Sequence, residues 1–189
     1  MIALGAWDWR HADWVGGFYP EDLPPDWRLT FYANEYDAVG LRAEDWLLPA
    51  PGVLRDWVED TREGFRFLLE WPETFPAGAS EGLGERLAIL APRLGALLTG
   101  DETSVHVSVP EGVPVWARER VAHDFVEALE TARPPLLLLG GQGLDDLREA
   151  RRAIESLGAR GDAIILVEGA EVLSRLSRLR TLRDLSGWQ

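Results

Sequence analysis

The sequence predicts an α/β fold in which parallel strands alternate with helices. Apolar runs that fit strands alternate six times with segments that fit helices, and helical crossovers between strands give a parallel sheet. The later runs are rich in leucine or β-branched residues, as strands buried on both faces should be. A complete eight-unit barrel takes about 250 residues, so 189 residues leave room for about six units. Either an incomplete or small barrel or an open doubly wound sheet would fit.

Six short apolar runs are expected to be strands, and most of them stop at a proline, a glycine or a charged residue. They cover residues 2–6, 38–41, 65–71, 104–109, 135–139 and 163–167. The segments between them are expected to be helices, the first of which opens at Pro24. The others cover residues 53–61, 83–98, 114–131, 144–157 and 171–185. Leucines three or four residues apart make 83–98 the clearest helix, and Pro92 inside it should kink or split it.

The loop after the first strand carries four large aromatic residues, Trp9, Trp14, Phe18 and Tyr19. Leaving these side chains in water would forfeit much of the free energy gained on burial. We therefore expect them to pack as a plug or lid over one end of the sheet.

Composition excludes several classes of function. The net charge of −13 disfavours binding to a nucleic-acid backbone. All 19 basic residues are arginine and there is no cysteine, so lysine Schiff bases, phosphate-loop lysines, thiol nucleophiles and disulfides are excluded. No apolar run approaches the roughly 20 residues that a membrane span needs, and no signal peptide is evident. We expect an acidic cytoplasmic protein with no membrane partner.

Several motifs resemble the opening of the YecE-like family, whose uncharacterised members have a TIM-barrel-like fold. They are Leu-Gly-Ala-Trp at 4–7, Trp-Val-Gly-Gly-Phe-Tyr-Pro-Glu at 14–21, and Leu29, Tyr32, Ala33, Tyr36 and Val39. The similar region runs to about Pro72. The resemblance favours an incomplete or small TIM-barrel-like fold of about six β/α units. It implies no settled activity. The length of 189 residues predicts a single domain over residues 1–189.

Two carboxylates are the candidate catalytic residues, because Glu70 and Glu168 each end an apolar strand. Functional residues collect at the carboxyl ends of parallel strands. Partial desolvation there would raise the pKa of a carboxyl group toward acid–base use, and a pair of carboxyl groups at a set distance hydrolyses glycosidic bonds. The alternative is that Glu70 forms a structural ion pair with Arg10 or Arg42.

Seven further residues near the same strand ends are candidates for ligand binding. Arg10 and Arg42 would hold an anionic or hydroxylated ligand, and three tryptophans would form its walls. The full set is Trp7, Asp8, Arg10, His11, Arg42, Trp46 and Trp71.

The sequence identifies no cofactor and no metal site. The three histidines lack metal-ligand spacing, although His11 with nearby carboxylates is a weaker candidate for magnesium or manganese. The glycines around Gln142 follow a strand and precede a helix, but Asp145 and Asp146 at the start of that helix would repel phosphate. We interpret that segment as a tight turn.

Two functions remain open. One is a barrel-like protein that binds or hydrolyses a small polar or anionic ligand at the strand ends. The other is a degenerate, non-catalytic relative that acts through protein contacts. The resemblance supports the second in part, since relatives commonly carry a lysine after the third strand, where this chain has Glu70.

The leucine-rich C-terminal segment suggests an assembly. Its leucines recur every three residues at 173, 176, 179, 182 and 185. They could cover the open edge of an incomplete barrel or meet a second copy in a homodimer. The dimer is the favoured expectation, because an apolar stripe of this length is seldom left bare.

Overall fold

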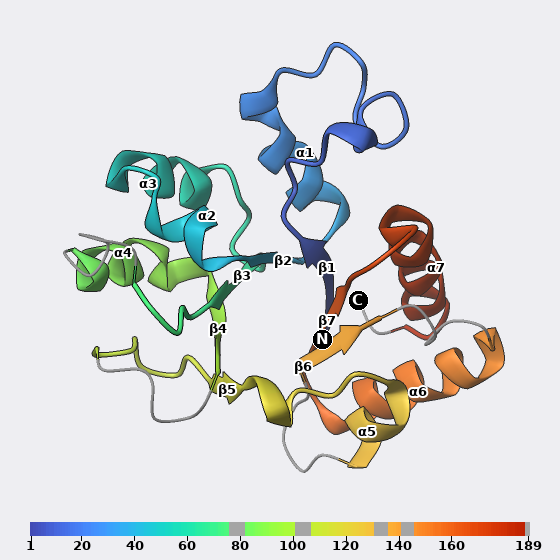
Figure 1. Ribbon diagram of the computed structural model, residues 1–189. Coiled ribbons are helices and arrows are strands. Elements are labelled where there is room, and N and C mark those ends of the chain that lie inside the picture. The colour runs from blue at the N-terminus through green and yellow to red at the C-terminus, as the bar shows by residue number, and fades with distance from the viewer. Residues whose placement is uncertain (76–81, 101–106, 131–135, 141–145, 188–189) are drawn as a thin grey trace. The chain divides into compact units, whose positions relative to one another are not determined.

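The structure is a computed structural model that describes residues 1–75, 82–100, 107–130, 136–140 and 146–187 (Figure 1). These residues form seven strands that alternate with helices, and the strand pairings described below are all parallel. The chain has two compact units. The central unit is Asp8–Arg120, and the terminal unit combines Met1–Trp7 with Val121–Gln189. The expectation of a single domain over 1–189 stays a prediction.

The sheet of the central unit has the strand order β2–β3–β4–β5. Its strands are β2 (Ala38–Leu41), β3 (Arg66–Glu70), β4 (Leu94–Thr99) and β5 (Val115–Ala117). Its helices are α1 (Arg28–Glu35), α2 (Ala43–Leu47), α3 (Pro51–Glu59) and α4 (Leu83–Leu90). Helices α3 and α4 lie side by side (Figure 1). Parallel pairing brings the carboxyl ends of these four strands to one edge.

The helix predicted over 83–98 is wrong beyond its first half. Pro92 splits the segment as expected, but a short 3-10 turn, Ala91–Arg93, then leads into strand β4. A Cβ on Gly95 would come within 2.9 Å of the Arg66 Cβ on neighbouring β3, so this position needs glycine. The leucines of β4 are buried on both faces of the sheet. They therefore do not alternate with polar residues, and their spacing also fits a helix.

The next two predicted elements also change. Residues 104–106 lie outside the described part of the chain, and 107–109 do not form a strand. The helix predicted over 114–131 instead begins as strand β5, continues through a 3-10 turn at Arg118–Arg120, and is α-helical only in α5 (Phe125–Glu130). The β-branched and aromatic residues Val115 and Trp116 favour the extended conformation. The described residues therefore hold seven strands where six were predicted.

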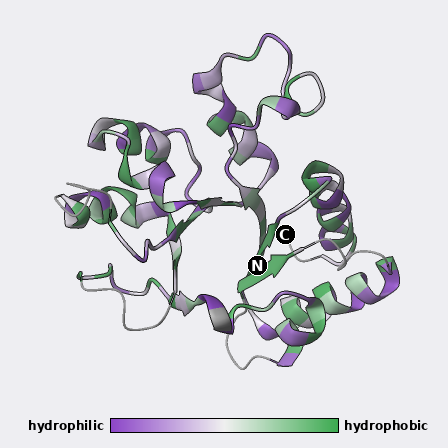
Figure 2. Cartoon of the chain, in the orientation of Figure 1, coloured by the Kyte–Doolittle hydropathy of each residue, from purple (hydrophilic) through white to green (hydrophobic). Residues whose placement is uncertain are grey.

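The terminal unit has a three-stranded sheet in the order β1–β7–β6. The strands are β1 (Ile2–Trp7), β6 (Leu136–Leu139) and β7 (Ala163–Val167), and helices α6 (Leu147–Arg160) and α7 (Val172–Leu185) accompany α5. Figure 2 shows β6 and β7 as almost wholly hydrophobic. Asp146 caps α6 by accepting the N–H groups of Arg148 and Glu149, and these hydrogen bonds lower the pKa of Asp146.

Helix α7 packs on the sheet of its own unit through leucines and arginines together. Leu176 and Leu179 are fully buried, and α7 contacts β1, β7 and α6. Arg175 donates to the carbonyl oxygens of Glu168, Leu139 and Gly140 at the ends of β7 and β6. Part of the leucine stripe is thus covered within the chain. The homodimer stays a prediction, and Leu185 is the stripe's most exposed leucine.

Three of the four aromatic residues of the opening loop are buried in a packed cluster, as predicted, whereas their expected position over one end of the sheet stays a prediction. Trp9, Trp14 and Tyr19 are almost fully buried. Trp14 stacks on Tyr32 of α1 with ring centres 6.1 Å apart, and Trp9 meets Trp57 of α3 edge-on at 5.0 Å. The Tyr19 hydroxyl donates to the Trp9 carbonyl oxygen at 2.6 Å. The cluster therefore holds the loop against helices α1 and α3.

None of the helices in the described segments combines the length and the apolar character needed to cross a bilayer.

Replacing Trp14 by alanine should lower the free energy of unfolding by about 3 kcal/mol or more, because the change removes a buried indole and leaves a cavity. Chemical denaturation measures this loss. Trp27, which is 65% exposed, is the matched control, and Trp27→Ala should change stability by less than about 0.5 kcal/mol. A loss below about 1 kcal/mol for Trp14→Ala would contradict the packing of the cluster.

Alkaline pH should destabilise the protein through Tyr19. Burial raises the pKa of Tyr19, although the Arg28 guanidinium over its ring opposes the shift. The raised pKa means that the unfolded chain releases this proton first, so the free energy of unfolding should fall as pH rises above about 10. Denaturation series at about pH 9, 10 and 11 for wild type and Tyr19→Phe test this. Parallel pH profiles above about pH 10 would refute it.

Candidate functional site

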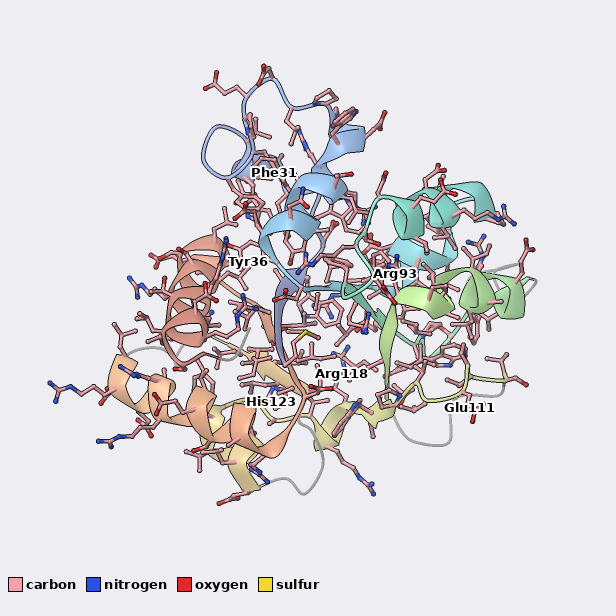
Figure 3. All side chains as sticks on the ribbon, turned by 180° about the vertical axis from the view of Figure 1, so that it is seen from behind. Phe31, Tyr36, Arg93, Glu111, Arg118 and His123 are labelled. Atoms are coloured by element: carbon pink, nitrogen blue, oxygen red, sulfur yellow. The ribbon has the colours of Figure 1, made fainter. Side chains whose placement is uncertain are left out.

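Glu70 lies at the centre of an ion triad at the carboxyl ends of the central strands. Its Oε1 atom accepts from Arg42 Nη1 at 3.1 Å and also from Arg118 Nη2. Arg42 follows β2, Glu70 ends β3, and Arg118 (Figure 3) follows β5. The Glu70 carbonyl oxygen accepts from the Trp46 indole at 3.0 Å. Two cations thus compensate one carboxylate that is largely screened from solvent.

A second set of charges adjoins the triad. Arg10 donates to Asp8 Oδ1 at 2.8 Å and to Asp45, while Asp45 Oδ2 accepts the backbone N–H of Arg42 at 3.1 Å. Burial by itself disfavours the charged guanidinium of Arg10, but hydrogen bonds and charge from Asp8 and Asp45 outweigh it and raise the pKa of Arg10. Asp8 has a φ of 56°, a conformation that costs energy for a residue with a Cβ atom. Its carboxylate offsets part of this cost by accepting the N–H groups of Trp9 and Arg10.

A cavity of about 350 Å³ opens beside Glu70. It lies at the carboxyl ends of β3 and β4 and beside the turn after β5. Its lining residues are Glu70, Trp71, Pro72, Glu73, Thr74, Leu98, Thr99, Gly100 and Arg118. Both charged and apolar side chains therefore face one space.

Some polar groups in this lining have no protein partner in the described part of the chain. Within it, no hydrogen bond reaches Oε2 of Glu70, the Nε and Nη1 groups of Arg118, or the Glu73 carboxylate. The Arg118 side chain is half exposed. The Thr99 hydroxyl, in contrast, donates to the Trp116 carbonyl oxygen at 3.3 Å. A bound molecule would find both donors and acceptors here.

The structure places the predicted site residues in both units. Asp8, Arg10, Arg42 and Glu70 come together in the central unit through the ion pairs described above. The alternative expectation, an ion pair between Glu70 and Arg42, is therefore observed. The His11 ring contacts the Trp14 ring in a tilted arrangement, with ring centres 4.3 Å apart.

The three predicted tryptophans differ in accessibility. Trp46 is fully buried, with its ring 6.0 Å from that of Trp71. Trp71 lines the cavity but is only 3% exposed. Trp7, in the terminal unit, donates its indole N–H to Glu168 Oε2 at 3.1 Å. Because Trp46 is fully buried, its role is structural: its indole N–H donates to the Glu70 carbonyl oxygen.

Glu70 and Glu168 belong to different units, and their expected action as a catalytic pair stays a prediction. Residues 141–145, including the turn around Gln142, lie outside the described part of the chain. Among the described residues, no three His, Asp or Glu side chains are grouped so as to hold a metal ion.

Sequence reasoning missed Arg118 and Glu73. Arg118 falls inside the helix predicted over 114–131, so its position at the end of a strand was not recognised. The available signal was the run Pro114-Val-Trp-Ala, a short extended segment that ends at an arginine. Glu73 follows Pro72, which stops β3.

Parallel strands, intervening helices and charged side chains at the strand ends define the class of TIM-barrel-like α/β proteins. The chain belongs to the YecE-like family, described as "Protein of unknown function DUF72", whose sequence profile matches residues 3–105. The resemblance seen in the sequence is thereby confirmed. The curated proteins include no match to this chain.

Solved structures of two family members share the fold. A DUF72 family protein from Thermotoga maritima is 14% identical, with 97% of this chain and 99% of that chain covered and a TM-score of 0.63. Another, from Enterococcus faecalis, is 13% identical, with 97% and 96% covered and a TM-score of 0.58. The fold is therefore α/β and resembles an incomplete TIM barrel, as predicted.

Replacing Glu70 by glutamine should lower the free energy of unfolding by about 1–3 kcal/mol, because Arg42 and Arg118 would lose the charge that compensates them. Glu85→Gln is the matched control, since Glu85 pairs with Arg55 and both side chains are more than half exposed. The control should change stability by less than about 0.5 kcal/mol. Equal effects of the two substitutions in chemical denaturation would show that the triad contributes no more than a surface ion pair.

Proposed function

We propose that the cavity beside Glu70 binds a small polar ligand. Its volume of about 350 Å³ lies at the lower end of the range for small-molecule sites. It also lies at the carboxyl ends of parallel strands, where such folds carry their binding residues.

The observation that carries the proposal is the set of polar groups in the cavity lining that the described residues leave without partners. The Arg118 side chain is half exposed and that of Glu70 is one-fifth exposed, so these groups are open to solvent and accessible to a ligand. Arg118 is held by Glu70 through only one of its nitrogens, so its other N–H groups remain to bind a ligand. Glu70 lines the cavity and holds Arg118 there, and Arg42 is a positioning residue that holds Glu70.

Hydrolysis of the bound molecule is a further step that this site supports less directly. Glu70 already accepts from two guanidinium groups through one oxygen, which suits a residue that orients Arg118. The expected acid–base role for Glu70 together with Glu168 stays a prediction.

A thermal-shift screen of sugars, nucleotides, organic acids and divalent metals tests for binding. We expect at least one class of small polar compound to raise the unfolding temperature of wild type in a dose-dependent way. Arg118→Gln should weaken that ligand's affinity about tenfold or more, since it removes charged hydrogen bonds. Arg55→Gln, an exposed arginine of the same unit, should leave the affinity unchanged.

Two outcomes would count against a ligand-binding cavity. One is that no compound in the screen stabilises wild type. The other is that every stabilising compound acts equally on wild type and Arg118→Gln. Either result would favour the alternative, a non-catalytic relative that acts through protein contacts.

A further inference from the structure

The Glu70–Arg118 ion pair presents a hydrogen-bond acceptor and hydrogen-bond donors side by side. Glu70 uses Oε1 for Arg118 and Arg42, and within the described residues its Oε2 accepts nothing. Arg118 uses Nη2 for Glu70, and its Nη1 and Nε groups likewise have no described partner. A ligand at this point meets a negative oxygen and positive N–H groups within the span of one ion pair.

The described cavity lining carries charges of both signs. It contains the carboxylates of Glu70 and Glu73 and the guanidinium of Arg118. Arg42, outside the lining, also pairs with Glu70 and offsets part of its charge. A ligand with a net charge is attracted by the side chains of opposite sign but is repelled by those of like sign at a similar distance.

Hydroxyl groups fit this arrangement, because each of them both donates and accepts. On two neighbouring carbons, one hydroxyl can donate to Glu70 Oε2 while the other accepts from Arg118 Nη1. A carboxylate can only accept, so it would face the Glu70 oxygen unfavourably. An ammonium group can only donate, so it would face Arg118 unfavourably.

We infer that the ligand is an uncharged polyhydroxylated compound, such as a monosaccharide or polyol, held through a pair of adjacent hydroxyl groups. This inference rests on the proposed binding function of the cavity. Pro72 and Leu98 supply apolar surface in the same lining, and the C–H groups of a sugar ring can pack against it. The ion pair recognises the hydroxyls, and the apolar residues recognise the carbon skeleton.

The test compares ligands that share one ring and differ in charge. Ligand-observed NMR with wild-type protein measures affinities for neutral hexoses and pentoses of several stereochemistries, linear polyols, and the matching uronic acids, amino sugars and deoxy sugars. We expect a neutral compound to bind about fivefold or more tightly than its uronic acid and its amino sugar, the ratio that one unfavourable charge contact produces. Loss of one of the two adjacent hydroxyls should weaken binding about fivefold or more.

Variants separate recognition by the ion pair from charge selection. Arg118→Gln and Glu70→Gln should each weaken the neutral ligand about tenfold, and Arg55→Gln should not. Glu73 is exposed and forms no described hydrogen bond, so Glu73→Gln should fold as wild type does. It should strengthen binding of the uronic acid roughly threefold to fivefold relative to the neutral sugar. Unfolding temperatures of all variants, measured in the same buffer, check that each is folded.

The possible failures are distinguishable. If a uronic acid or an amino sugar binds more tightly than every neutral compound, and Arg118→Gln abolishes that binding, the cavity binds a ligand but the inference about its charge is wrong. Nucleotides or organic acids from the thermal-shift screen could bind through Arg118 while no neutral compound does. That outcome would also mean that the cavity binds a ligand but that the inference about its charge is wrong. If no compound of any class depends on Arg118, both the inference and the proposed binding function fail.

Discussion

Parallel strand pairing is the constraint on which the candidate site depends. In the central unit it brings the residues that follow β2, β3 and β5 to one edge of the sheet, although they are distant in sequence. Arg42 and Arg118 can both reach Glu70 for this reason. The same edge carries the cavity beside the triad, which is lined by residues at and just after the ends of β3 and β4.

The chain has 19 arginines and no lysine, and its arginines serve several structural purposes. In the central unit, Arg42 and Arg118 compensate the charge of Glu70, and Arg10 joins Asp8 to Asp45. In the terminal unit, Arg175 binds backbone carbonyl groups where two strands end. A guanidinium group has several N–H donors in one plane, so one side chain can hold more than one partner. A lysine at position 118 would have a single charged nitrogen to divide between Glu70 and a ligand.

The sequence predicted the fold class and part of the candidate site, and the errors have physical causes. Alternating apolar runs located β1, β2, β3, β6 and β7, and the ends of β2 and β3 pointed correctly to Arg42 and Glu70. Strand β4 was missed because its leucines, buried on both faces, continue the helical spacing of α4. Arg118 was missed because β5 has only three residues, too few for a period to appear. The Glu70–Arg42 ion pair was one of the alternatives drawn from the sequence, but the Glu70–Arg118 pair, which joins residues 48 positions apart, was not predicted.

The discontinuity of the terminal unit affects how the protein is made. Trp7 and Glu168 bond to each other where β1 and β7 end, yet they are 161 residues apart. At typical rates of synthesis, β1 leaves the ribosome on the order of ten seconds before β7 exists. The central unit is continuous and can begin to pair its strands during that interval. The wholly apolar β1 can therefore pair with β7 only after nearly the whole chain has been made, so the terminal unit is completed last.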